Sequence, residues 1–299
     1  MTDPQPLTPA TRCAALSLAR GDQLEGTAAP VSRWLLIEHP GPWGRVALRD
    51  SRLDQSVARE LEARCRGAGV RPMLIRRAGR AAATAARRWA YVDSRLGHEG
   101  MWWGRYDVDR DLTDVALDGS AGVRSGDPAY LVCTHARHDA CCAIRGRPVA
   151  AAIAALRPEQ AWECSHTGGD RFAANVVVLP HGLYYGTVTP LRVPDLLSSY
   201  EDGRVLPDLL RGRSAFPMAV QAAQHHARDA VGDLGLTALA PTDVRQLDPA
   251  TWQVRFDRPG GAVTVSVRAR VSDPLPRLTC SAAGSQPVLW YDVAGIVVG

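Results

Sequence analysis

The sequence predicts an α/β protein that ends in a small region of helix and antiparallel sheet. Residues 31–94 and 129–188 each show the order strand, helix, strand, strand. Residues 251–299 instead alternate apolar and polar positions around a Pro-Gly-Gly turn, as antiparallel strands do. A chain of 299 residues, 46% of them hydrophobic, can bury two or three cores.

These patterns divide the chain into four expected parts. They are a loosely held arm over 1–30, an α/β unit over 31–125, a second α/β unit over 126–200, and a C-terminal helical and antiparallel β region over 201–299. The small polar segment 120–129 provides the boundary between the two α/β units.

The first α/β unit begins with the strand VSRWLLIEH, residues 31–39. A helix follows over 51–69, because its apolar residues recur at helical spacing, and strands follow at 70–77 and 86–94. The segment MWWGRYDVDRDLTDV, residues 101–115, resembles a calcium-binding loop through its alternating aspartates. It has Leu112 where that loop needs glycine and Asp118 where it needs glutamate, so we expect a solvated loop.

The second α/β unit begins with AYLVCTH, an apolar strand over residues 129–135. Asp139 is placed to cap a helix that ends near Leu156. The short strand WECSH then enters the Gly168–Gly169 turn, and AANVVVLPHGLYYGTV predicts a strand, a turn and a returning strand.

Two helices are expected between this unit and the C-terminal strands, in VPDLLSSYEDG and AFPMAVQAAQHHARDAVGDLG. His225 and His226 lie in the second of these helices. Because adjacent helical positions point about 100° apart, we expect that the two cannot face one metal ion.

Charge and hydropathy argue against nucleic-acid and membrane partners. The net charge is +4, but the arginines are dispersed among acidic residues rather than gathered in one block. The chain has no apolar run of about 18 residues, and MTDPQPLTPATRC has no signal-peptide pattern. We therefore expect a cytoplasmic protein.

The chain has seven cysteines, an odd number that does not suggest a paired disulfide framework. Cys13, Cys65 and Cys280 are isolated, and we expect each to be a small buried hydrophobic residue. The other four fall between residues 133 and 164, which favours metal binding or thiol chemistry there.

The segments CTHARHDACC, residues 133–142, and ECSHTGGDRF, residues 163–172, carry these four cysteines. Iron–sulfur clusters and structural zinc both need thiolate or imidazole ligands from two segments of fixed backbone. Cys133 ends a strand, Cys142 lies at the start of a helix, and Cys164, His166 and Asp170 come from a strand and its glycine turn. In a β-α-β-β unit these positions can converge at one end of the sheet.

The run C-T-H-A-R-H-D-A-C-C, followed by H-T-G-G-D-R-F-A-A-N, resembles the sucrase/ferredoxin-like family. The resemblance covers roughly residues 31–200. It implies a thioredoxin-like ferredoxin unit in which two cysteines and two histidines hold a [2Fe–2S] cluster. On this chain the cysteines are Cys133 and Cys142, and the first histidine is His166.

The chain departs from the family's pattern at the second histidine, where it has Asp170. A carboxylate is a harder ligand than imidazole, so Cys164 and Cys141 also become candidates for the fourth ligand. We favour Cys164 or Asp170. His135 and His138 flank the turn before the helix, and we expect them to support the ligands or to lie at the surface.

The resemblance implies a one-electron carrier rather than a catalyst with its own substrate. Its partner would be an unidentified reductase or acceptor enzyme, and the arginines near the ligands would form either a solvated rim or a positive collar. The alternatives are a structural zinc module with a Cys₃His set and a thiol-based redox protein. The second is weaker because the chain has no C-x-x-C motif.

Overall fold

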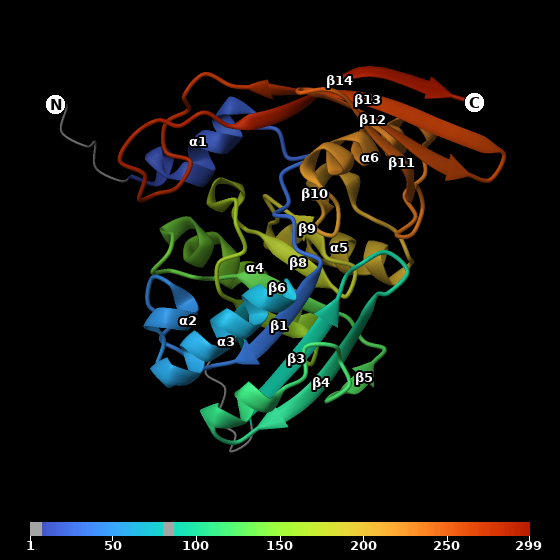
Figure 1. Ribbon diagram of the computed structural model, residues 1–299. Helices are drawn as coiled ribbons and strands as arrows, with labels where there is room; N and C mark the ends of the chain where they lie inside the picture. Colours follow the sequence, from blue (N-terminus) through green and yellow to red (C-terminus); the bar gives the residue numbers. More distant parts are fainter. Residues whose placement is uncertain (1–7, 80–86) are drawn as a thin grey trace. The chain divides into compact units, whose positions relative to one another are not determined.

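A computed structural model describes residues 8–79 and 87–299 and shows a mixed α/β architecture (Figure 1). The chain forms two compact units. The second unit holds residues 31–168 and 173–182, and the first holds residues 1–30, 169–172 and 183–299.

The second unit is built on a mixed β-sheet. Its strands lie in the order β8-β6-β7-β2-β1-β3-β4-β5. Their bounds are Arg33–Glu38 for β1, Arg71–Arg76 for β2, Arg87–Asp93 for β3, Gly100–Tyr106 for β4, Val123–Ser125 for β5, Ala129–Cys133 for β6, Ala161–Cys164 for β7 and Val176–Leu179 for β8.

Two strand pairs of this sheet are parallel, and a helix connects the strands of each pair. Helix α3 (Gln55–Ala68) joins β1 to β2, and α4 (Ala140–Leu156) joins β6 to β7. The short helix α2 (Ala47–Asp50) precedes α3. Strand β7 also pairs with β2 in the antiparallel sense, which places both expected β-α-β-β units in one sheet.

Helix α3 forms where the sequence predicts a helix. Asp54 caps it by accepting hydrogen bonds from the backbone amides of Ser56 and Val57. Val57, Leu61 and Cys65 recur at intervals of four residues and are buried against the sheet. The apolar spacing and the cap therefore specify this helix together.

The segment 101–115 differs from the loop that the sequence analysis expects. Its first part is strand β4, which pairs with β3 along its length. Gly104 stands opposite Trp89 and lies against its indole ring, where a Cβ would clash. Only the part after Tyr106 is irregular. It contains the 3₁₀ helix η2 (Asp109–Asp114), where Asp111 accepts hydrogen bonds from the backbone amides of Asp107 and Val108.

The first unit contains three longer helices and two groups of strands among the described residues. The helices are α1 (Cys13–Arg20), α5 (Val193–Glu201) and α6 (Met218–Val231), and the short 3₁₀ helices are η1 (Pro9–Thr11), η3 (Asp170–Phe172), η4 (Pro190–Arg192) and η5 (Pro207–Leu209). Strands β9 (Leu183–Tyr185) and β10 (Leu210–Arg213) pair in the antiparallel sense.

The expected C-terminal sheet is present and has four antiparallel strands in the order β11-β12-β13-β14. They are β11 (Pro241–Asp248), β12 (Thr251–Arg258), β13 (Gly261–Val271) and β14 (Leu289–Val298). The alanine-rich face of α6 packs against valines of β12 and β13, which gives this unit its core. In the segment expected as a loose arm, α1 buries Cys13 and Ala14, while residues 1–7 lie outside the described part.

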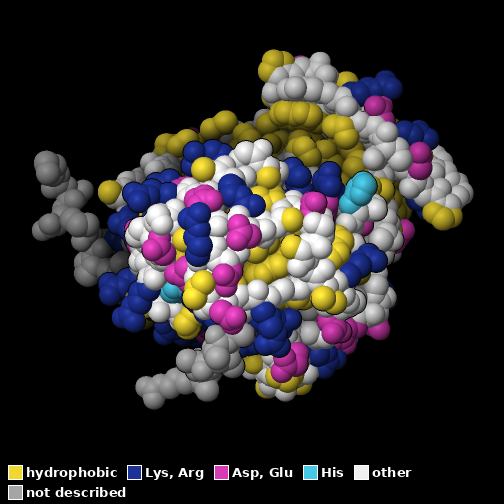
Figure 2. Space-filling view, turned by 60° about the horizontal axis from the view of Figure 1, so that its bottom comes forward, with side chains coloured by type: hydrophobic (Ala, Val, Ile, Leu, Met, Phe, Trp, Pro, Cys, Tyr) yellow, Lys and Arg dark blue, Asp and Glu magenta, His cyan; other side chains and the backbone are white. Residues whose placement is uncertain are grey.

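Basic and acidic side chains alternate over the face in Figure 2 rather than gathering in one patch. Within residues 8–79 and 87–299, no helix has the length and apolar character needed to cross a membrane.

Candidate functional site

The candidate site of the second unit lies where strands β6 and β7 end and helix α4 begins. Cys133 is the last residue of β6, and Cys164, in register with it, is the last residue of β7. Cys142 lies in the first turn of α4. All three side chains are buried. The structure thus brings strand ends and a helix start together, as the sequence analysis expects.

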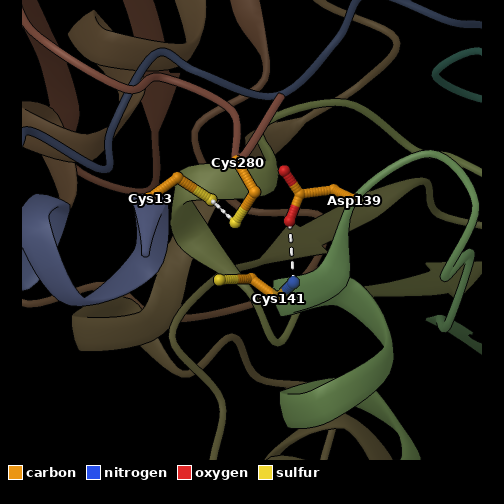
Figure 3. A group of neighbouring side chains, drawn as sticks. All are labelled: Cys13, Asp139, Cys141 and Cys280. Carbon is orange, nitrogen blue, oxygen red and sulfur yellow. Dashed lines mark hydrogen bonds between the residues drawn. The ribbon is translucent and has the colours of Figure 1, made fainter. Parts of the chain in front are cut away.

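The start of α4 is fixed by Asp139, as its position predicts. Its carboxylate accepts a hydrogen bond of 2.7 Å from the backbone amide of Cys141 (Figure 3). The amides of a helix N-terminus favour negative charge nearby, so a thiolate at Cys142 is favoured there.

Cys133 is the central residue of the site. A hydrogen bond with the Cys142 side chain, assisted by one with His166, holds the pKa of the Cys133 thiol well below its usual range, although burial alone would raise it. A depressed thiol pKa favours the thiolate, the form that binds metals. Three of the predicted ligands, Cys133, Cys142 and His166, are therefore in mutual contact through Cys133.

Cys164 has a different electrostatic environment. Burial, and next the charge of Cys133, raise its thiol pKa well above the usual value. This thiol therefore stays protonated in the protein without a metal. Cys164 lies beside Cys133 on the neighbouring strand, so the structure places it on the cysteine side of the site.

Asp170 lies in η3 and belongs to the first unit. Its side chain is buried, and another buried residue, Arg211, lies close to the neighbouring backbone at Gly169. The Arg211 guanidinium lies against Gly169, where a Cβ would clash with it, and 5.0 Å from the centroid of the Phe172 ring. A buried cation in the same unit thus lies close to η3, and a nearby cation favours an ionised carboxylate.

His135 supports the turn between β6 and α4, one of the two roles the sequence analysis leaves open. Its Nδ1 accepts a hydrogen bond of 3.3 Å from the backbone amide of His166, so its Nε2 carries the proton and donates to the carbonyl of Gly44 at 2.8 Å. Burial lowers its pKa, which keeps the ring neutral. Both ring nitrogens of His135 are therefore engaged.

His138 is the functional candidate that the sequence analysis does not identify as a ligand. It is half-buried, and its ring stacks on that of His166 with 3.6 Å between centroids and 27° between planes. The two side chains offer ring nitrogens within 4.8 Å of each other. Sequence spacing could not reveal this contact, because 28 residues separate the two histidines and only the folded turn brings them together.

The first unit contains a second group of possible ligands in helix α6. His225, His226 and Asp229 offer ligand atoms that all lie within 4.8 Å of one another. The expectation that His225 and His226 cannot face one ion is therefore wrong. Adjacent helical positions do diverge, but rotation about the side-chain bonds brings the two ring edges back together, with centroids 5.4 Å apart.

The isolated cysteines are buried, as the sequence analysis expects. Within the first unit, the Cys280 thiol lies 3.5 Å from the sulfur of Cys13 (Figure 3). In the second unit, burial raises the pKa of Cys65 to about 11, which makes this thiol inert.

The possible ligands of the site differ in how deeply their side chains are buried. The cysteine sulfurs are buried, whereas His138 and His166 are half-buried. Two thiolates with imidazole nitrogens beside them fit an iron–sulfur cluster or a zinc ion in donor chemistry. Of these residues, Cys133, Cys142 and His166 fit the group that the sequence motif implies.

Known proteins are similar to parts of this chain. Two solved structures are similar to part of the chain, both of variants of the thioredoxin-like [2Fe-2S] ferredoxin from Aquifex aeolicus. Each is 20% identical, with TM-scores of 0.25 and 0.24, and the match covers 28% of this chain and 97% of the ferredoxin. No curated protein matches. The family model described as sucrase/ferredoxin-like matches residues 24–212, and the chain therefore belongs to the sucrase/ferredoxin-like family.

Proposed function

We propose that this protein is a one-electron carrier that holds a [2Fe–2S] cluster through Cys133, Cys142 and His166. The observation that carries the proposal is the pair of hydrogen bonds that the Cys142 and His166 side chains make with the Cys133 thiol. They bring two cysteines and an imidazole from separate segments to one place and favour the thiolate at its centre. For the fourth ligand the sequence names Cys164 and Asp170.

The depth of the ligands suits electron transfer. The cysteines are shielded from solvent, whereas the imidazole of His166 is half-buried. A bound cluster would supply the one-electron redox chemistry. The protein's contribution would be to hold it in a fixed environment while leaving one edge accessible to a partner.

Histidine ligation has a consequence for the reduction potential. Replacing thiolate by neutral imidazole raises the potential relative to all-cysteine ferredoxins. A ligand histidine also keeps one ring nitrogen that can bind or release a proton. We therefore expect a potential above that of plant-type ferredoxins.

The partner would be another redox protein. Arg137 is exposed in the turn between β6 and α4, and Arg147 is exposed in α4. The guanidinium of Arg71 donates to the carbonyl of His166 at 2.8 Å, which adds a fixed positive charge beside the site. Positive charge of this kind favours an acidic docking surface on the partner.

A reductive titration of the protein, purified without oxygen, tests the proposal. Electron transfer predicts a coloured protein whose visible bands bleach with dithionite after uptake of about one electron per chain, and return in air. A colourless protein with about one zinc ion per chain would instead identify a structural zinc module. A colourless protein without metal would leave thiol chemistry.

A further inference from the structure

The ring contact between His138 and His166 points to a fourth ligand that the sequence motif does not name. His138 is held in a hydrogen-bonded turn, because its amide and that of Asp139 both donate to the carbonyl of His135 at 3.1 Å. The Asp139 cap then fixes the start of α4, where Cys142 lies. The backbone of His138 is thus as firmly placed as that of the cysteines.

The distance between the rings suits a shared metal. The ring nitrogens of His138 and His166 lie within 4.8 Å of each other. Two nitrogens bound to one tetrahedral ion through bonds of about 2.1 Å are about 3.4 Å apart. Rotation about the side-chain bonds of the two histidines is needed to close that difference and to turn both nitrogens toward one ion.

We infer that His138 is the fourth ligand of the cluster, and that it shares one iron with His166 while Cys133 and Cys142 hold the other. This inference rests on the proposed function. Such a division, with two cysteines on one iron and two histidines on the other, is chemically stable, as Rieske centres show. It also matches the depths of the ligands, since both cysteines are buried and both histidines are half-buried.

Two neighbouring side chains of the second unit are placed less well for this position. Cys164 lies beside Cys133 rather than beside His166, so it would add a third ligand on the cysteine side. Both nitrogens of His135 are engaged, with the His166 amide and the Gly44 carbonyl.

Pulsed electron paramagnetic resonance on the dithionite-reduced full-length protein tests the inference by detecting the ¹⁴N nuclei bound to iron. We expect two strongly coupled nitrogens in the wild type. The variant H138C should keep the colour and lose one of the two couplings, because thiolate replaces imidazole. A lower reduction potential should accompany that loss.

Three variants serve as controls. R137A changes the exposed neighbour in the same turn, and C164S and D170N remove the other two candidates. Each should keep both nitrogen couplings. A single coupling in the wild type, or two couplings in H138C, would overturn the assignment of His138 while leaving the cluster in place. A wild-type protein without iron and sulfide would overturn the proposed function and, with it, this inference.

Discussion

Gly146 of α4 lies directly against the carbonyl oxygen of Cys133, so close that a Cβ at residue 146 would overlap that oxygen. The glycine therefore sets how closely α4 approaches the end of β6. This approach also brings Cys142 to Cys133. We expect Gly146→Ala to cost about 1–3 kcal/mol in unfolding free energy and to lower the iron content by separating the two cysteines.

Gly67→Ala is the matched control for this prediction. Gly67 lies in helix α3 of the same unit, is exposed, and has no atom within 4 Å of the position that a Cβ would take. Alanine should stabilise that helix by about 0.5–1 kcal/mol and leave the iron content unchanged. Chemical denaturation and iron analysis check both variants. Equal stability of the two would contradict the close contact at Gly146.

Removal of either buried cysteine that we propose as a ligand should abolish metal binding. We expect Cys133→Ser and Cys142→Ser each to lower bound iron at least about tenfold, because serine oxygen is a poor ligand for an iron–sulfur iron. Cys65→Ser is the control. Cys65 is equally buried in the second unit, but it belongs to helix α3 and packs in the hydrophobic core between that helix and the sheet. Full iron content in Cys133→Ser would remove that cysteine from the site.

The hydrogen bond that caps α4 should contribute measurably to the free energy of unfolding. Asp139→Ala removes the acceptor of the Cys141 amide at the start of the helix. We expect a loss of about 1 kcal/mol, or a melting temperature lower by about 2–4 °C. Asp54→Ala at the cap of α3 provides the comparison, because that aspartate makes the same kind of bond at an exposed site away from the ligands.

Acid should destabilise the second unit through His39. Burial, and next the positive charge of Arg87, lower the pKa of His39 below 6.5. The unfolded chain therefore binds a proton at His39 more readily than the folded chain does. The stabilising contribution of the neutral ring is complete above pH 6.5 and is lost as pH falls through the lower pKa of the folded state.

His39→Asn isolates this contribution. Asparagine can still accept the hydrogen bond that Nδ1 of His39 accepts from the amide of Gly41, but it does not titrate. Unfolding free energies at several pH values between 5 and 7 should fall less steeply toward acid in the variant than in the wild type. Identical slopes would show that His39 does not titrate differently on folding.

The reduction potential should itself depend on pH. If histidine nitrogens bind iron, reduction makes the cluster more negative and raises the proton affinity of the outer ring nitrogens. The potential should then fall as pH rises from neutral to alkaline. Protein-film voltammetry over that range measures it, and a potential that stays constant would argue against histidine ligation.

Local patterns in the sequence predict much of the second unit. The apolar spacing of α3 and the capping position of Asp139 each specify an element by themselves, and both elements form as expected. Cys133 ends its strand because an apolar run stops there. The approach of Cys133, Cys142 and His166 follows from the β-α-β connection, which returns the chain to the same edge of the sheet.

The features that the sequence analysis missed depend on distant parts of the chain. Strand β4 was not predicted as a strand, because the aspartate-rich sequence that follows it is typical of a loop. Its pairing with β3, a strand earlier in the sequence, determines its structure. Strand β2 pairs with β7, whose residues lie about 90 positions later in the sequence, and no local sequence pattern predicts this pairing. The stacking of His138 on His166 is of the same kind, since the two histidines lie 28 positions apart in the sequence.

Quantification of iron, acid-labile sulfide and zinc in the protein purified without oxygen tests the central proposal most directly. The proposed [2Fe–2S] cluster predicts about two irons and two sulfides per chain, with little zinc. About one zinc per chain, with neither iron nor sulfide, would contradict the electron carrier and identify the site as a structural zinc centre.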